Sequence, residues 1–117
     1  MANRRKIGLE KETLAAEYLM THGVKILKKN FYFSGGEIDL IAQDKEYLCF
    51  IEVKYRTSNQ YGLPENAVTR EKQKKIMFGA KKYLYQQHFS LDTPCRFDVI
   101  SIYQEKITWI QNAFELI

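Results

Sequence analysis

Two apolar segments separated by a short polar turn restrict the fold of this chain more than any other feature. Residues 37–42 alternate between polar and apolar and then become apolar, and residues 47–54 form a run of aromatic, aliphatic and β-branched side chains. Residues 43–46 between them are polar. Two such runs around a short polar loop predict a β-hairpin. Because the second run is apolar on both faces, we expect it to be an interior strand that is covered on both sides.

The remaining segments predict helices and strands that complete such a sheet. Helical spacing and a stop at Gly23 predict a helix near residues 9–21, and a longer helix follows near residues 69–87. Further strands are expected at residues 24–33, 96–103 and 107–110, and a loop at residues 55–65. A right-handed crossover through the second helix would make strand 97–102 parallel to strand 47–54. The sequence therefore predicts one α/β domain over residues 1–117, with a mixed five-stranded sheet flanked by helices.

Composition limits the class of protein rather than its function. The 117 residues carry 18 basic and 14 acidic side chains, a net charge of +4 that favours a nucleic-acid partner only slightly. No apolar run is long enough to span a membrane, and residues 1–10 lack the apolar segment of a signal peptide. Cys49 and Cys95 are far apart without a CxxC motif, so we expect reduced core cysteines and a cytoplasmic location.

Four charged residues, Glu37, Asp39, Glu52 and Lys54, lie within the two predicted hairpin strands. Side chains alternate along a strand, so Glu52 and Lys54 share one face. A two- or four-residue loop centred on residues 44–45 would pair residue 39 with residue 50 and residue 37 with residue 52. This register places Asp39 on the face of Glu52, one pair away along the diagonal. A loop of three or five residues would reverse that parity and separate the two acids.

Asp39, Glu52 and Lys54 together suit metal-dependent phosphodiester chemistry. Two converging carboxylates are suitable ligands for a hard cation, and Mg²⁺ leaves positions for water and phosphate. The Lys54 ammonium group would contact the scissile phosphate or the attacking water. A Glu and a Lys two apart more often form a surface ion pair, but charges on an interior strand are costly unless they are paired or functional. Glu37 is a second acid on the face of Asp39, and it either ligates the metal or stabilises the turn at Gly36.

Three sequence segments carry a resemblance to a known family. They are Gly-Glu-Ile-Asp-Leu-Ile-Ala at residues 36–42, Phe-Ile-Glu-Val-Lys-Tyr-Arg at residues 50–56, and Arg-Phe-Asp-Val at residues 96–99. In this order they resemble the YraN-like family of bacterial proteins. That family is generally uncharacterised, resembles archaeal Holliday-junction resolvases, and belongs to the PD-(D/E)xK, restriction-endonuclease-like superfamily. The similarity covers nearly the whole chain, including residues 67–69 and the Lys72-Gln73 pair.

The resemblance implies both a fold and a set of site residues. The implied fold is a restriction-endonuclease-like α/β/α sandwich around a mixed sheet. Asp39 and Glu52 would be metal ligands, Lys54 the catalytic lysine and Glu12 a third acid supplied by the first helix, with Gln73 as an accessory residue. The family usually has Gly before that Glu, whereas this chain has Lys11. The implied cofactor is Mg²⁺ or Mn²⁺.

The resulting functional prediction is a Mg²⁺-dependent endonuclease acting on DNA, with branched or damaged structures as candidate substrates. Basic residues near the second helix would bind the nucleic-acid backbone, and the candidates are Arg56, Arg70, Lys72 and Lys75. Two other hypotheses stay open: a nucleic-acid-binding or interaction module that keeps a nuclease fold without turnover, and a structural protein whose acids only pair with lysines. Resolvase-like proteins are often dimers, so a homodimer is the assembly to consider.

Overall fold

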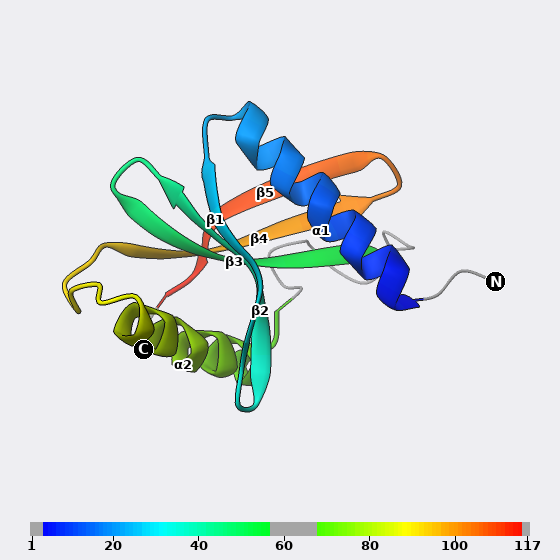
Figure 1. Cartoon of the computed structure of the whole chain (residues 1–117). Coiled ribbons are helices and arrows are strands. Elements are labelled where there is room, and N and C mark those ends of the chain that lie inside the picture. The colour runs from blue at the N-terminus through cyan, green and yellow to red at the C-terminus, as the bar shows by residue number, and fades with distance from the viewer. Residues whose placement is uncertain (1–3, 57–67, 116–117) are drawn as a thin grey trace.

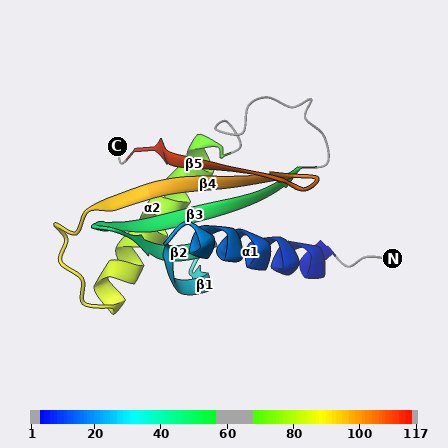
Figure 2. The ribbon, with the colours of Figure 1, turned by 90° about the horizontal axis from the view of Figure 1, so that it is seen from above.

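The described residues form a twisted five-stranded sheet with one helix packed on each face (Figures 1 and 2). The structure, a computed structural model, describes residues 4–56 and 68–115. The elements in chain order are α1 (Arg4–Thr21), β1 (Lys25–Phe33), β2 (Gly36–Asp44), β3 (Tyr47–Arg56), α2 (Arg70–Gln86), β4 (Cys95–Tyr103) and β5 (Lys106–Phe114). The strands follow the order β1-β2-β3-β4-β5, in which β3 and β4 are parallel and every other neighbouring pair is antiparallel. The predicted α/β class and mixed sheet are confirmed.

Local signals in the sequence account for the ends of both helices. α1 stops where Gly23 takes a φ of +82°, and the N–H of Val24 donates to the Leu19 carbonyl oxygen. α2 begins after Thr69, whose hydroxyl oxygen accepts from the N–H of Lys72 at 3.2 Å. Most of the predicted loop at residues 55–65 lies outside the described residues, but Tyr55 and Arg56 belong to β3.

Each helix closes its own hydrophobic core against one face of the sheet. On the α1 side, Ala15, Ala16 and Leu19 pack with the side chains of Leu40, Ala42, Cys49, Ile51, Ile100 and Ile102. On the α2 side, Ile76, Ala80 and Tyr83 pack with those of Ile38, Ile41, Leu48, Phe50, Phe97 and Val99. Burial on both faces explains why β3 and β4 are continuous apolar runs rather than alternating ones.

The β2–β3 hairpin keeps the predicted parity but has a different register. Its turn contains only Lys45 and Glu46, because residues 43 and 44 extend β2. The pairs run from Asp44↔Tyr47 to Leu40↔Ile51, so the predicted pairing of residue 39 with residue 50 is wrong by two positions. Because a shift of two preserves the faces, Asp39 still lies on the same side as Glu52. Continuing the observed register would place Asp39 directly opposite Glu52 rather than on the diagonal.

The two hairpin strands separate beyond Leu40↔Ile51, and we call this point the β2–β3 fork. Regular alternation would place residues 38 and 40 on one face, yet Ile38 packs on the α2 side and Leu40 on the α1 side. In β1, Lys29 and Phe31 pair with Leu40 and Ile38, and Asn30 between them has a φ of +55°. The strands therefore turn over at Asp39, and the β1–β2 end continues beside α2 (Figure 1).

The last strand, β5, is longer than the sequence predicts. It continues to Phe114 rather than ending at residue 110, because the Phe114 ring is buried against Phe97 with ring centroids 5.1 Å apart.

None of the described helices is long and apolar enough to cross a membrane.

Candidate metal centre

Asp39 and Glu52 are buried acids at the β2–β3 fork. Asp39 is 6% exposed and Glu52 is 4% exposed. The N–H of Val53 donates to Asp39 Oδ2 at 2.8 Å, so the Asp39 side chain takes up a backbone donor of β3 where the two strands have separated. This hydrogen bond joins the Asp39 carboxylate of β2 to Val53 of β3, the residue that follows Glu52. It therefore holds Asp39 close to Glu52.

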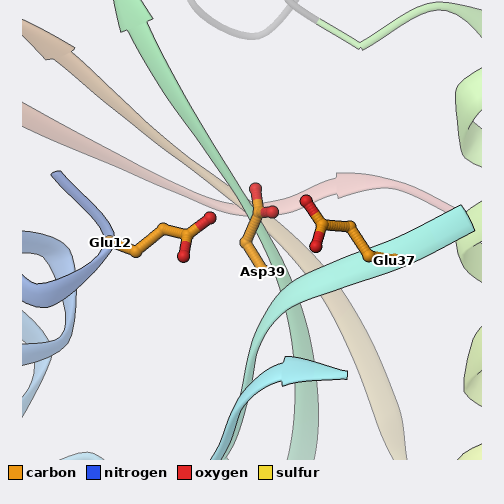
Figure 3. A group of neighbouring side chains, drawn as sticks. All are labelled: Glu12, Glu37 and Asp39. Atoms are coloured by element: carbon orange, nitrogen blue, oxygen red, sulfur yellow. The ribbon is translucent and has the colours of Figure 1, made fainter. Parts of the chain in front are cut away.

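Glu12 and Glu37 complete a cluster around Asp39. Glu12 comes from α1 and Glu37 from β2, and Figure 3 shows the Asp39 carboxylate between theirs. One potential ligand atom from each of the three side chains lies within 4.8 Å of the others. The side chains of Asp39 and Asn30 lie near enough to Glu12 to lower its pKa. The predicted approach of Glu12 from the first helix is present in the geometry, and Asn30 is a neighbour that the sequence does not predict.

Burial and mutual repulsion govern the charge of these acids. Burial, and after it repulsion by Glu52, raise the pKa of Asp39 to about 9, while the hydrogen bond from the Val53 N–H opposes both effects. Burial also raises the pKa of Glu12, with repulsion from Glu37 as the next cause. With a pKa of about 9, Asp39 keeps its proton at neutral pH when no cation is bound. The proton then lowers the negative charge of the cluster, which a bound cation would otherwise offset.

The donor set fits a hard divalent cation. Among the described residues, the buried side-chain oxygens without a hydrogen-bond partner are Glu12 Oε2 and Glu52 Oε2. Buried carboxylate oxygens are costly when they are unpaired, and a cation would satisfy them. A site built from carboxylates alone matches the oxygen preference of Mg²⁺ and Mn²⁺. Glu12, Glu37 and Asp39 form the close group, whereas direct ligation by Glu52 stays a prediction.

Two lysines contact Glu52 from different elements. Lys54 Nζ lies 3.6 Å and Lys72 Nζ 3.5 Å from the same atom, Glu52 Oε1. Both lysine side chains are 36% exposed, while that of Glu52 is 5% exposed. Lys54 lies where strand alternation predicts it. The sequence predicts Lys72 as a residue of α2 that binds the nucleic-acid backbone, but it does not predict the contact with Glu52, which depends on how α2 docks on the sheet.

The other predicted residues lie around the start of α2 and the end of β3. The side-chain amide of Gln73 donates to the Val68 carbonyl oxygen at 3.1 Å, which fixes Val68 just before the N-cap residue of α2. Arg70 and Lys75 are exposed on α2, and Lys75 has a loose contact of 3.9 Å with Glu71. Arg56 is the last residue of β3 and is partly exposed. The nucleic-acid contacts of these residues and the accessory role of Gln73 stay predictions.

The fold and the site together define a small α/β protein with an acidic cluster that could hold a metal ion. A family model described as "Uncharacterised protein family UPF0102" matches residues 11–102. A UPF0102 protein of Lachnoclostridium phytofermentans is 47% identical over 113 residues, which cover 97% of this chain and 96% of the relative. UPF0102 proteins of Saccharophagus degradans and Geobacter metallireducens are 41% and 46% identical, and the matches cover 99% and 97% of this chain and 98% and 96% of the relatives. The chain therefore belongs to the UPF0102 family, which confirms the resemblance at the level of the family.

Proposed function

We propose that this protein is a divalent-cation-dependent endonuclease of the PD-(D/E)xK, restriction-endonuclease-like type that hydrolyses phosphodiester bonds in DNA. The observation that carries the proposal is the set of acids at the β2–β3 fork, in which one buried oxygen each of Glu12 and Glu52 has no hydrogen-bond partner in the described part of the chain. A purely structural set of ion pairs would satisfy these oxygens, because an unpaired buried charge destabilises the fold. The resemblance to Holliday-junction resolvases makes branched DNA the first substrate to test.

The side chains have distinct tasks in this proposal. Asp39 and Glu52 hold the cation, Glu12 assists from α1, and Glu37 lies close enough to Asp39 to contribute an oxygen. Mg²⁺ or Mn²⁺, when bound, would acidify a water molecule and offset charge on the phosphate. Lys54 lies beside Glu52 and can stabilise the negative charge that develops on phosphate oxygens.

Basic residues next to the acids support nucleic acid as the substrate class. Four acids gathered in one place would repel a phosphate backbone unless positive charge lay beside them. Lys54 and Lys72 contact Glu52, while Arg70 and Lys75 extend the positive charge along the exposed side of α2. Phosphate contacts of this kind give affinity without sequence readout, so we expect strongly salt-dependent binding.

The test is a cleavage assay on linear, single-stranded, flapped and four-way DNA with Mg²⁺ or Mn²⁺. We expect metal-dependent cleavage of at least one substrate, and a loss of about 10²-fold or more in Glu52→Gln and Lys54→Met. Glu17→Gln is the matched control, because Glu17 is an exposed acid of the helix that carries Glu12. A Glu52→Gln protein that cleaves like the wild type would overturn the proposal, because the cleavage would not depend on this site. Salt-dependent binding without cleavage of any substrate would instead support the binding module.

Cation binding can be tested without turnover. A ligand that binds only the folded chain raises its melting temperature, so Mn²⁺ is expected to stabilise the wild type. Glu12→Gln should weaken that effect and Glu17→Gln should not. An identical melting temperature with and without Mn²⁺ would contradict the metal-dependent mechanism.

A further inference from the structure

Lys72 is positioned differently from the other lysines of α2. It is the third residue of the helix, and its backbone N–H is fixed by the bond to Thr69 Oγ1 at 3.2 Å. Its side chain crosses from the helix layer to the sheet and places Nζ 3.5 Å from Glu52 Oε1. The other lysines of α2, at positions 74, 75, 81 and 82, are exposed. The orientation of Lys72 is therefore a feature of the acid site and not of the solvated helix surface.

The contacts of Glu52 are asymmetric. Both Lys54 and Lys72 approach its Oε1 atom, whereas Oε2 is buried and has no partner among the described residues. One carboxylate balances one ammonium group, so the second ammonium group brings more positive charge than Glu52 alone can neutralise. The carboxylates of Glu12 and Glu37 nearby help to offset this excess. A divalent cation that binds Glu52 would take over the balancing of its charge and would repel both lysines.

We propose that Lys72 is an internal counter-ion of Glu52 that a divalent cation displaces, after which it contacts a phosphate group of the nucleic acid. This inference rests on the proposed function and adds a positioning residue to it. Lys54 is less suited to the exchange, because β3 holds its backbone, in register with Ser101 of β4, only two residues from Glu52. The two lysine side chains are equally exposed, at 36%, so the difference lies in the elements that carry them: Lys72 reaches the site from α2, in another layer than the strand of Glu52.

The exchange predicts effects of opposite sign on two ligands. Removing Lys72 removes a competitor for Glu52 and a positive charge near the cation, so cation binding should become about threefold to tenfold tighter. The same change removes a phosphate contact, so DNA binding in the presence of the cation should weaken. The slope of the logarithm of the binding constant against the logarithm of the salt concentration should fall by about one. A residue that merely held the site in shape would weaken both ligands when it was removed.

The experiment is a calorimetric titration of Mn²⁺ into the full chain and its variants. Lys72→Met should bind Mn²⁺ about threefold to tenfold more tightly than the wild type, and Lys72→Arg should bind it like the wild type. Lys74→Met is the matched control, because it removes the same charge from an exposed neighbouring position of α2 and should leave the affinity unchanged. Lys72→Gln serves as a second neutral variant if Lys72→Met does not fold, and it should show the same tightening.

DNA binding supplies the second readout. Fluorescence anisotropy with a duplex oligonucleotide and Mn²⁺, measured in a Lys54→Met background to suppress cleavage, should show weaker binding for Lys72→Met. A wild type that binds no Mn²⁺ overturns the proposed function and the exchange with it. A wild type that binds Mn²⁺ while both neutral variants bind it equally or more weakly overturns only the exchange. Tighter Mn²⁺ binding without weaker DNA binding overturns the phosphate contact.

Discussion

Replacing Asp39 by Asn should stabilise the metal-free protein at alkaline pH, although it removes a central acid of the candidate site. The amide oxygen of Asn can still accept from the Val53 N–H, which lies 2.8 Å from Asp39 Oδ2. Asp39 must take up a proton on folding to avoid the repulsion of Glu52, Glu12 and Glu37, whereas Asn is neutral at every pH. The substitution therefore keeps the hydrogen bond and removes the cost of taking up that proton.

The magnitude follows from the pKa of Asp39, which is raised from an ordinary value of 3.8 to about 9. The folded chain binds this proton more tightly than the unfolded chain does. The associated stability is complete below pH 4 and is lost as the pH rises through 9. Each pH unit inside this window costs about 1.4 kcal/mol, or about 4 kcal/mol between pH 5 and pH 8. Because Glu12 and Glu52 share the repulsion, we expect a smaller effect: between pH 5 and pH 8 the gain of Asp39→Asn over the wild type should grow by about 2 kcal/mol in unfolding free energy, or roughly 8 °C in melting temperature.

The assay is thermal unfolding of wild type and Asp39→Asn in a metal-free, EDTA-treated buffer between pH 5 and pH 8. The gain of the variant over the wild type should grow with pH. Adding Mn²⁺ should raise the melting temperature of the wild type and not that of the variant, since a cation would stabilise the ionised acids. A variant that is less stable than the wild type at pH 8, or a gain that does not change with pH, would refute the reasoning.

Other predictions concern the packing away from the acids. Asp98→Ala should lower the free energy of unfolding by about 3–5 kcal/mol, because fully buried Asp98 accepts hydrogen bonds from Arg96, Trp109 Nε1 and the Asn112 N–H. An unchanged midpoint of urea unfolding would contradict this. Gly79→Ala should cost about 1–3 kcal/mol despite the better helix propensity of Ala, since a Cβ there would clash with the Phe33 ring, and Phe33→Leu should reduce the loss. Native Cys49 should resist alkylation at pH 8 and react after unfolding, because burial raises the pKa of its thiol to about 12.

The grouping of Asp39, Glu52 and Lys54 on one face of the sheet could be predicted, because it depends only on strand alternation and on the parity of the hairpin loop. Glu52 and Lys54 are two residues apart on one strand, and any hairpin loop with an even number of residues places Asp39 on their side. The turn has two residues, one of the predicted lengths, but it is formed by residues 45–46 and is not centred on residues 44–45. That difference moves the register by two positions and leaves the face unchanged, so the grouping is insensitive to the exact turn.

The rest of the site depends on tertiary packing, which strand periodicity does not describe. Lys72 contacts Glu52 only because α2 docks with its first turn at the fork, and helical spacing alone gave no reason to separate it from the neighbouring lysines. Asn30 reaches Glu12 from a strand that turns over at a positive φ. The only signal for that turn is that Asn tolerates left-handed backbone better than most residues do.

The turnover of the strands at the β2–β3 fork has a consequence for the newly synthesised chain. Glu12 reaches the fork from the α1 layer and Lys72 from the α2 layer, so neither half of the chain contains the complete group of charges. Under the proposed function, a nascent or partly unfolded polypeptide would therefore be unable to cut DNA. Hydrolytic activity would arise only after both α1 and α2 have packed on the sheet. Incompletely folded chains would therefore not damage DNA during biosynthesis.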